Sequence, residues 1–105
     1  NFLKAQNPSI TITSLSKGIS NGYSTSKNIF KLSFITSENT INFTANDIIL
    51  YNAEIISFSG KNNTYNAKFK ILNKGIATVE VYGYSFTDSE GNFNKGSEQF
   101  TIFKD

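Results

Sequence analysis

Residues 64–71, T-Y-N-A-K-F-K-I, alternate between polar and apolar side chains. The apolar set is Tyr65, Ala67, Phe69 and Ile71, and the polar set is Thr64, Asn66, Lys68 and Lys70. Successive side chains of a β-strand point to opposite faces, so this pattern gives one apolar face and one polar face. An amphipathic helix would instead repeat its apolar residues every three or four positions. The stretch therefore predicts a β-strand that buries one face.

The same alternation recurs along the rest of the chain. It is clear in residues 28–36 and 76–84, and weaker in residues 9–14, 47–52, 54–59 and 98–104. Clusters of Gly, Asn and Lys separate these segments, as in residues 60–63, and such clusters are typical of turns. Residues 21–27 fit no strand, and we expect them to form an inserted loop. Seven short strands joined by polar turns predict an all-β fold, an immunoglobulin-like β-sandwich of about seven antiparallel strands.

The length of 105 residues suits one domain with a single hydrophobic core. Pro8 precedes the first expected strand, where its missing backbone N–H removes no sheet hydrogen bond. We therefore assign residues 8–105 to one immunoglobulin-like domain and residues 1–7 to an N-terminal linker or strand extension. No run of about 18 apolar residues occurs, so we expect no membrane insertion.

The composition excludes several kinds of chemistry. The chain has no Cys and no His, which removes thiol nucleophiles, disulfides and the usual ligands of zinc and copper. Its Ser and Thr side chains lack the His partner that most often activates them, so we predict that the protein is not an enzyme. Its 10 basic residues are all Lys, and the net charge is only +2. Because nucleic-acid readers usually concentrate Arg and Lys on one face, we also predict no nucleic-acid binding.

The acidic side chains suggest a site for a hard cation. In an immunoglobulin-like sandwich, the loop after the second strand and the loop before the last strand lie at the same end. The candidate metal ligands there are Glu38, Asp47, Asp88, Glu90 and Asn92, and Asp105 would serve a following domain at the opposite end. Calcium is the expected cation, because it binds roughly six to eight oxygen ligands from carboxylates, amides and carbonyls. The alternative is that residues 88–92, D-S-E-G-N, form a β-turn without metal.

Three aromatic side chains form a second candidate site. Alternation along the last two expected strands predicts that Tyr82, Tyr84 and Phe103 face outward. Exposed aromatic rings can stack on sugar rings, so these are the candidate ligand-binding residues for glycans. Alternatively, they contact a neighbouring domain or are covered by residues 21–27.

A series of short motifs also follows the order of a known family. The motifs are P-S-I-T-I-T-S at residues 8–14, F-I-T-S-E at 34–38, F-T-A-N-D-I at 43–48, G-K-N-N-T-Y at 60–65, G-I-A-T-V-E-V at 75–81 and D-S-E-G-N at 88–92. In this order, across almost the whole chain, the sequence resembles the bacterial immunoglobulin-like (Big-type) repeats that occur in tandem in large surface and secreted adhesins. Ile35 and Thr36 lengthen the F-S-E motif of that family, and Tyr51-Asn52-Ala53 replaces its usual N-G-T.

The resemblance implies a non-catalytic structural or adhesive module of an extracellular protein, located at the cell surface or secreted. Its partners would be neighbouring immunoglobulin-like domains or identical subunits, and calcium at a domain junction would make the row rigid. Two alternatives stay open. One is a carbohydrate-binding accessory domain that uses the outward aromatics, and the other is a filament subunit that exchanges residues 1–6 with a neighbour.

Overall fold

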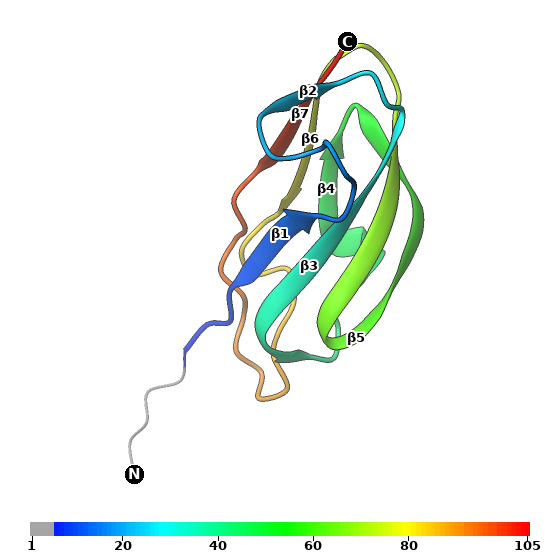
Figure 1. Cartoon of the computed structure of the whole chain (residues 1–105). Coiled ribbons are helices and arrows are strands. Elements are labelled where there is room, and N and C mark those ends of the chain that lie inside the picture. Colours follow the sequence, from blue (N-terminus) through cyan, green and yellow to red (C-terminus); the bar gives the residue numbers. More distant parts are fainter. Residues whose placement is uncertain (1–5) are drawn as a thin grey trace.

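The computed structural model describes residues 6–105, which form a sandwich of two β-sheets (Figure 1). The three-stranded sheet has the order β1-β3-β5, with bounds β1 Ile10–Ser14, β3 Ile29–Thr40 and β5 Ala53–Ile71. The four-stranded sheet has the order β2-β7-β6-β4, with bounds β2 Tyr23–Thr25, β7 Phe100–Lys104, β6 Gly75–Val81 and β4 Ile48–Tyr51. A turn of 3-10 helix, Ala45–Asp47, precedes β4. The predicted all-β sandwich of about seven strands is confirmed.

The predicted N-terminal linker or strand extension falls mostly on residues 1–5, which lie outside the described residues. Gln6 and Asn7 are exposed and precede β1, and Pro8 is buried. No helical segment of residues 6–105 has the length and apolarity that a membrane span requires.

The strand pairing differs from the prediction around β2. Residues 21–27, expected as an inserted loop, contain this strand. It pairs in parallel with β7, whereas the other four strand pairs are antiparallel. Gly22 N donates to Thr101 O and Thr101 N donates to Asn21 Oδ1, both at 2.7 Å, which extends the parallel pairing. A strand of three residues is too short to show a period-two pattern, so alternation could not reveal it.

Strand β5 unites two segments that the sequence predicts as separate strands, 54–59 and 64–71. It doubles back on itself, as its two limbs in Figure 1 show. Leu72 N donates to Asn52 O at 3.1 Å, which joins the chain across the open end of this hairpin. At the closed end Gly60 has a φ of +140°, within the turn predicted for residues 60–63.

Replacing Gly60 with Ala is expected to lower the free energy of unfolding by about 2 kcal/mol. An added Cβ would lie against the Thr64 carbonyl oxygen and 2.5 Å from Tyr65 Cα, so the closed end of the hairpin must shift. Gly18→Ala is the matched control, because Gly18 also has a positive φ, +82°, but an added Cβ there meets nothing within 4 Å. Urea unfolding compares the two variants. Equal losses would show that backbone φ alone matters, and would contradict the close approach at Gly60.

The core lies between the sheets and consists of the inward-facing side chains of their strands. In β3, Phe30, Leu32 and Phe34 are at most 1% exposed, and Phe30 stacks on Phe69 of β5 with ring centroids 5.2 Å apart. Phe43, from the loop after β3, closes one end of the core. Its ring contacts those of Phe34, Phe58, Tyr65 and Phe86.

The two ends of the sandwich are formed by different loops. The entry pole consists of Pro8, residues 37–47, which include the end of β3 and its connection to β4, and the loop 82–97. The exit pole consists of the loop 72–74 and Asp105. Figure 1 shows the start of β1 and the C-terminal residue at these opposite ends.

Candidate functional site

The two loops of the entry pole lie against each other, as the sandwich topology predicts. Thr87 N donates to Asn42 Oδ1 at 2.9 Å, and Asn42 Nδ2 donates to Thr87 Oγ1 at 3.0 Å, so one side chain joins the loops twice. Lys95 N donates to the Pro8 carbonyl at 2.8 Å, which attaches the chain ahead of β1 to the same pole. The pole is therefore one hydrogen-bonded unit built from three parts of the chain.

Asp88 is the most enclosed of the predicted metal ligands, with 4% of its surface exposed. Its Oδ1 accepts hydrogen bonds from the backbone N–H groups of Glu90 and Asn92, both at 2.9 Å, and its Oδ2 accepts one from Asn92 Nδ2 at 3.0 Å. The Asn92 side chain, followed by these backbone donors, holds the pKa of the Asp88 carboxyl below its ordinary value, although burial acts in the opposite direction. Both carboxylate oxygens therefore hold the turn 88–92 together.

Of the other predicted metal ligands, Asn92 contacts Asp88 as a hydrogen-bond donor, and the remaining ones do not gather around it. Exposed side chains are Glu38 and Glu90 at the entry pole and Asp105 at the exit pole. Asp47 Oδ2 accepts a hydrogen bond from Thr44 N at 2.8 Å, which holds the start of the 3-10 turn. Across residues 6–105, no three acidic side chains are grouped so that they could hold a metal ion. Calcium at this pole stays a prediction, and it requires oxygen ligands from an adjoining domain.

The Asp88 turn predicts an acid-sensitive part of the stability. A carboxyl with a depressed folded pKa stabilises the fold above its unfolded pKa, which is about 3.9 for Asp, and this contribution is lost as the pH falls through the folded pKa. Stability should therefore fall as the pH drops below about 5. Asp88→Asn should remove this part of the pH dependence, while Glu90→Gln, at an exposed neighbour, should keep it. Chemical unfolding between about pH 3 and pH 7 measures both, and an unaltered profile in Asp88→Asn would contradict this role.

Asn94 is a structural residue of the entry pole that the sequence does not indicate. It is 1% exposed and uses every polar atom of its side chain. Its Oδ1 accepts from Ser85 N at 2.7 Å and Phe86 N at 2.9 Å, and its Nδ2 donates to the carbonyls of Tyr82 and Lys95, both at 2.9 Å. In a chain rich in Asn, residue type alone could not distinguish this position from exposed Asn residues.

The three predicted ligand-binding aromatics do not form one platform. Phe103 is 40% exposed and lies opposite Ile76, at the exit-pole end of β6. Tyr82 follows the other end of that strand, about 20 Å away at roughly 3.3 Å per residue. Tyr84, 75% exposed, instead pairs with Phe93, with ring centroids 5.6 Å apart. The predicted glycan platform is therefore divided between the two poles.

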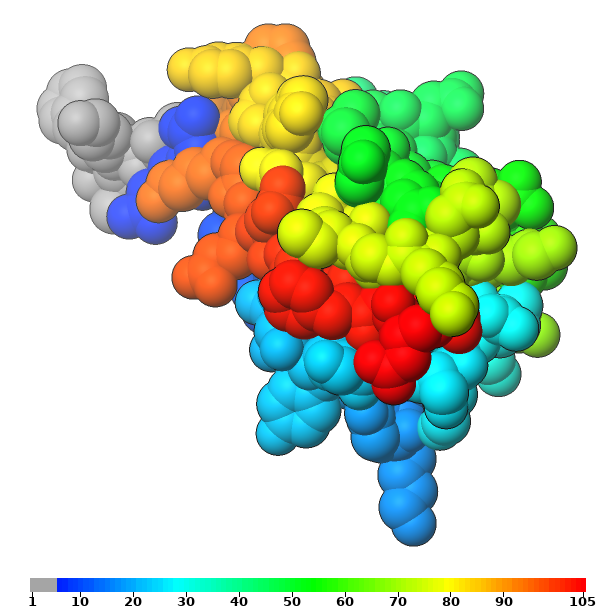
Figure 2. Space-filling view, turned by 90° about the horizontal axis from the view of Figure 1, so that it is seen from above, coloured from blue at the N-terminus to red at the C-terminus, as the bar shows by residue number. Residues whose placement is uncertain are grey.

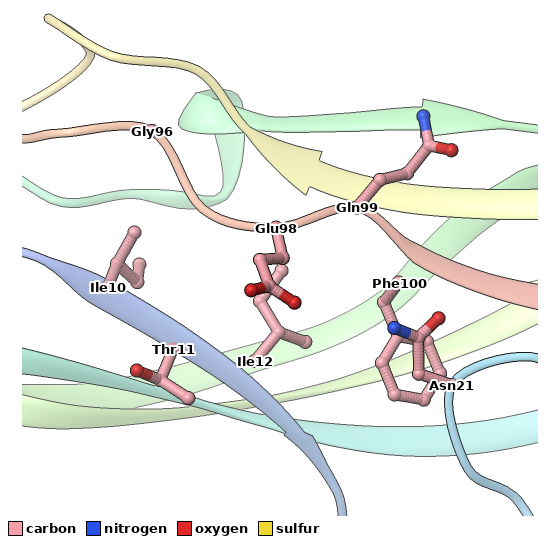
Figure 3. A pocket seen from close by; sticks show the side chains of 8 residues that line it. All are labelled: Ile10, Thr11, Ile12, Asn21, Gly96, Glu98, Gln99 and Phe100. Atoms are coloured by element: carbon pink, nitrogen blue, oxygen red, sulfur yellow. The ribbon is translucent and has the colours of Figure 1, made fainter.

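A hollow of about 300 Å³ lies between β1 and the segment that leads into β7 (Figure 3). Ile12 and Phe100 contribute apolar surface, and Glu98 extends toward β1. Gln99 points away from β1, and its Nε2 donates to Glu80 Oε1 at 3.2 Å. Strand β1 pairs with β3 along one edge, and its other edge borders this hollow. Sequence patterns could not indicate the hollow, because its walls are far apart along the chain.

No protein-family model matches the chain, and no curated protein or solved structure matches it either.

Proposed function

We propose that this protein is a non-catalytic structural module of an extracellular protein, and that it acts as a spacer between domains arranged in a row. The observation that carries the proposal is the separation of the points where the chain enters and leaves the fold. Pro8 is bonded to Lys95 at the entry pole, and Asp105 N donates to Thr25 O at 2.9 Å at the exit pole. A domain with this arrangement adds its full length to a row.

The exit pole offers a surface for a following domain. Figure 2 looks onto this pole and shows the C-terminal residues, in red, exposed between the segment near residue 75 and the segment near residue 25. The surrounding apolar side chains are also exposed, by 65% for Tyr51, 49% for Leu72 and 48% for Ile76. Exposed apolar surface of this kind suits contact with a neighbouring module.

The entry pole supports the same role because its loops are held rigidly. Asn42, Asp88 and Asn94 each bond backbone groups of the loop 82–97, and Pro8 is tied to the same loop. Hydrogen bonds from side chains to the backbone restrict its motion, so a domain attached ahead of Pro8 would meet a defined surface. The resemblance to adhesin repeats adds the expectation of a cell-surface or secreted location. Calcium between Asp47, Glu90 and a preceding domain would stiffen the junction further.

The spacer proposal is tested by the length of a linked pair. Two copies of the 105-residue chain joined head to tail should have a largest dimension in small-angle X-ray scattering close to twice that of one copy. A pair folded side by side, with a largest dimension near that of a single copy, would overturn the proposal. A flexible pair, with a broad distribution of lengths, would remove the claim of a stiff junction.

The calcium part of the proposal is tested separately in the same linked pair. Ligand that binds only the folded state raises the unfolding midpoint by mass action, so the midpoint should be higher in calcium than in excess chelator. Asp47→Asn should reduce this difference, and Glu54→Gln, on the first limb of β5, is the matched control. A midpoint that does not respond to calcium would remove the metal and leave the spacer role.

A further inference from the structure

A second hollow, of about 360 Å³, lies on the outer face of the three-stranded sheet. Its walls come from the loop after β1, from β3 and from both limbs of β5. The lining side chains that matter are Leu15, Lys31, Ser57, Ser59, Asn66 and Lys68. An acidic residue, Glu98, lines the hollow beside β1, whereas two lysines line this one.

The two lysines are direct cross-strand partners. Lys31 of β3 lies opposite Lys68 of β5 in the antiparallel register, on the face that points away from the core. The backbone of Lys31 is engaged on the β1 side, because its N–H donates to Ser16 Oγ at 2.8 Å and its carbonyl accepts from Leu15 N at 2.9 Å. Lys31 and Lys68 therefore form the narrow, non-hydrogen-bonded type of pair, with Cα atoms about 4.5 Å apart.

Such a pair of like charges destabilises a sheet unless an anion lies between them. The two side chains leave the sheet side by side, so a carboxylate or sulfate group could accept hydrogen bonds from both ammonium groups at once. The spacing comes from the strand register and needs no rearrangement of the backbone.

Neutral polar groups surround this pair of charges. Ser57 and Ser59 come from the first limb of β5. Asn66 comes from the second limb, two residues before Lys68. Their hydroxyl and amide groups both donate and accept hydrogen bonds. Leu15, 53% exposed, adds an apolar surface at the rim.

We propose that this hollow binds an acidic saccharide. Its carboxylate or sulfate group would lie between Lys31 and Lys68, its hydroxyl groups would bond the serines and Asn66, and the apolar face of a sugar ring would lie on Leu15. The two lysine charges alone would suit any anion. The serine hydroxyls and the Asn66 amide beside them favour an anion that also carries hydroxyl groups. This inference does not depend on the spacer role.

The experiment is calorimetric titration of the full chain with separate probes. They are a sulfated tetrasaccharide, an oligogalacturonate, a neutral maltooligosaccharide, inorganic sulfate and a short single-stranded DNA. The variants are the double change Lys31→Gln/Lys68→Gln and the single change Asn66→Ala. The controls are Lys74→Gln, an exposed lysine of the exit-pole loop, and Tyr84→Ala at the entry pole. Circular dichroism checks that each variant is folded.

The acidic saccharides should bind and the neutral one should not. Affinity should fall about tenfold in the double lysine variant and severalfold in Asn66→Ala, with both controls close to wild type. The lysine variant should be at least as stable as wild type because it removes a like-charge pair, so lost binding would not reflect unfolding. The proposal would be overturned if neither acidic saccharide bound. It would also be overturned if Lys74→Gln weakened saccharide binding as much as the double lysine change, or if DNA or inorganic sulfate bound as tightly as the acidic saccharides.

Discussion

Asn94→Ala is expected to lower the free energy of unfolding by about 4 kcal/mol. The change removes four hydrogen bonds at a side chain that is 1% exposed, and each contributes about 1 kcal/mol on average. It also leaves the N–H groups of Ser85 and Phe86 and the carbonyl of Lys95 without their partner, whereas the Tyr82 carbonyl keeps its hydrogen bond from Ser85 Oγ. Because these groups belong to both sides of the loop 82–97, the entry pole should loosen as a whole.

Urea unfolding with linear extrapolation measures this loss. Asn39→Ala is the matched control in the same pole, because the Asn39 side chain is exposed and its bond to Ser89 N uses only the backbone carbonyl. We expect this control to stay within about 0.5 kcal/mol of wild type. A loss below about 1 kcal/mol in Asn94→Ala would show that the loop does not depend on this side chain.

Phe34→Ala is expected to cost about 4 kcal/mol of unfolding free energy. The Phe34 side chain is fully buried, and its ring lies 6.0 Å from that of Phe43 and 6.2 Å from that of Phe69. Truncation would leave a cavity where the two sheets and the Phe43 loop meet, and rigid neighbouring rings can fill it only in part.

The neighbouring residue supplies the control for Phe34. Ile35 follows it in β3 but is 42% exposed, so Ile35→Ala should cost less than about 1 kcal/mol. The contrast between adjacent positions tests the register of β3, since a shift by one residue would exchange the two faces. Similar losses in both variants would contradict the inward position of Phe34.

The inward and outward faces of the long strands could be predicted from the sequence. Tyr65, Ala67 and Phe69 are buried as their alternation predicts, and so are Phe30 and Leu32. This succeeds because the backbone of a strand sends successive side chains to opposite faces, which is a local property. The meeting of the two loops at the entry pole was also predictable, because it follows from the topology common to such sandwiches.

The chemistry of the candidate sites was less predictable. Asp88, a candidate calcium ligand, forms the hydrogen bonds that the turn alternative for residues 88–92 would require. The aromatic platform assumed that Tyr82 and Phe103 are neighbours, yet the β6–β7 register places them at opposite ends of the sheet. Parity along each strand says which face a residue occupies, but it carries no information on how far two strands are offset.

The sequence by itself determined the all-β class, the main strands and the apolar face of each, because these depend on side-chain alternation and turn-forming residues within short stretches. The tertiary structure alone decided the parallel pairing of β2 with β7, the four bonds of Asn94 and the apposition of Lys31 with Lys68. The β2–β7 and Lys31–Lys68 pairs join residues distant in the chain, and the packing of the two sheets selects them. The Asn94 bonds lie within the loop 82–97, and the path of that loop through the fold sets them. Many Asn and Lys residues share the same local pattern, so only the fold distinguishes these positions.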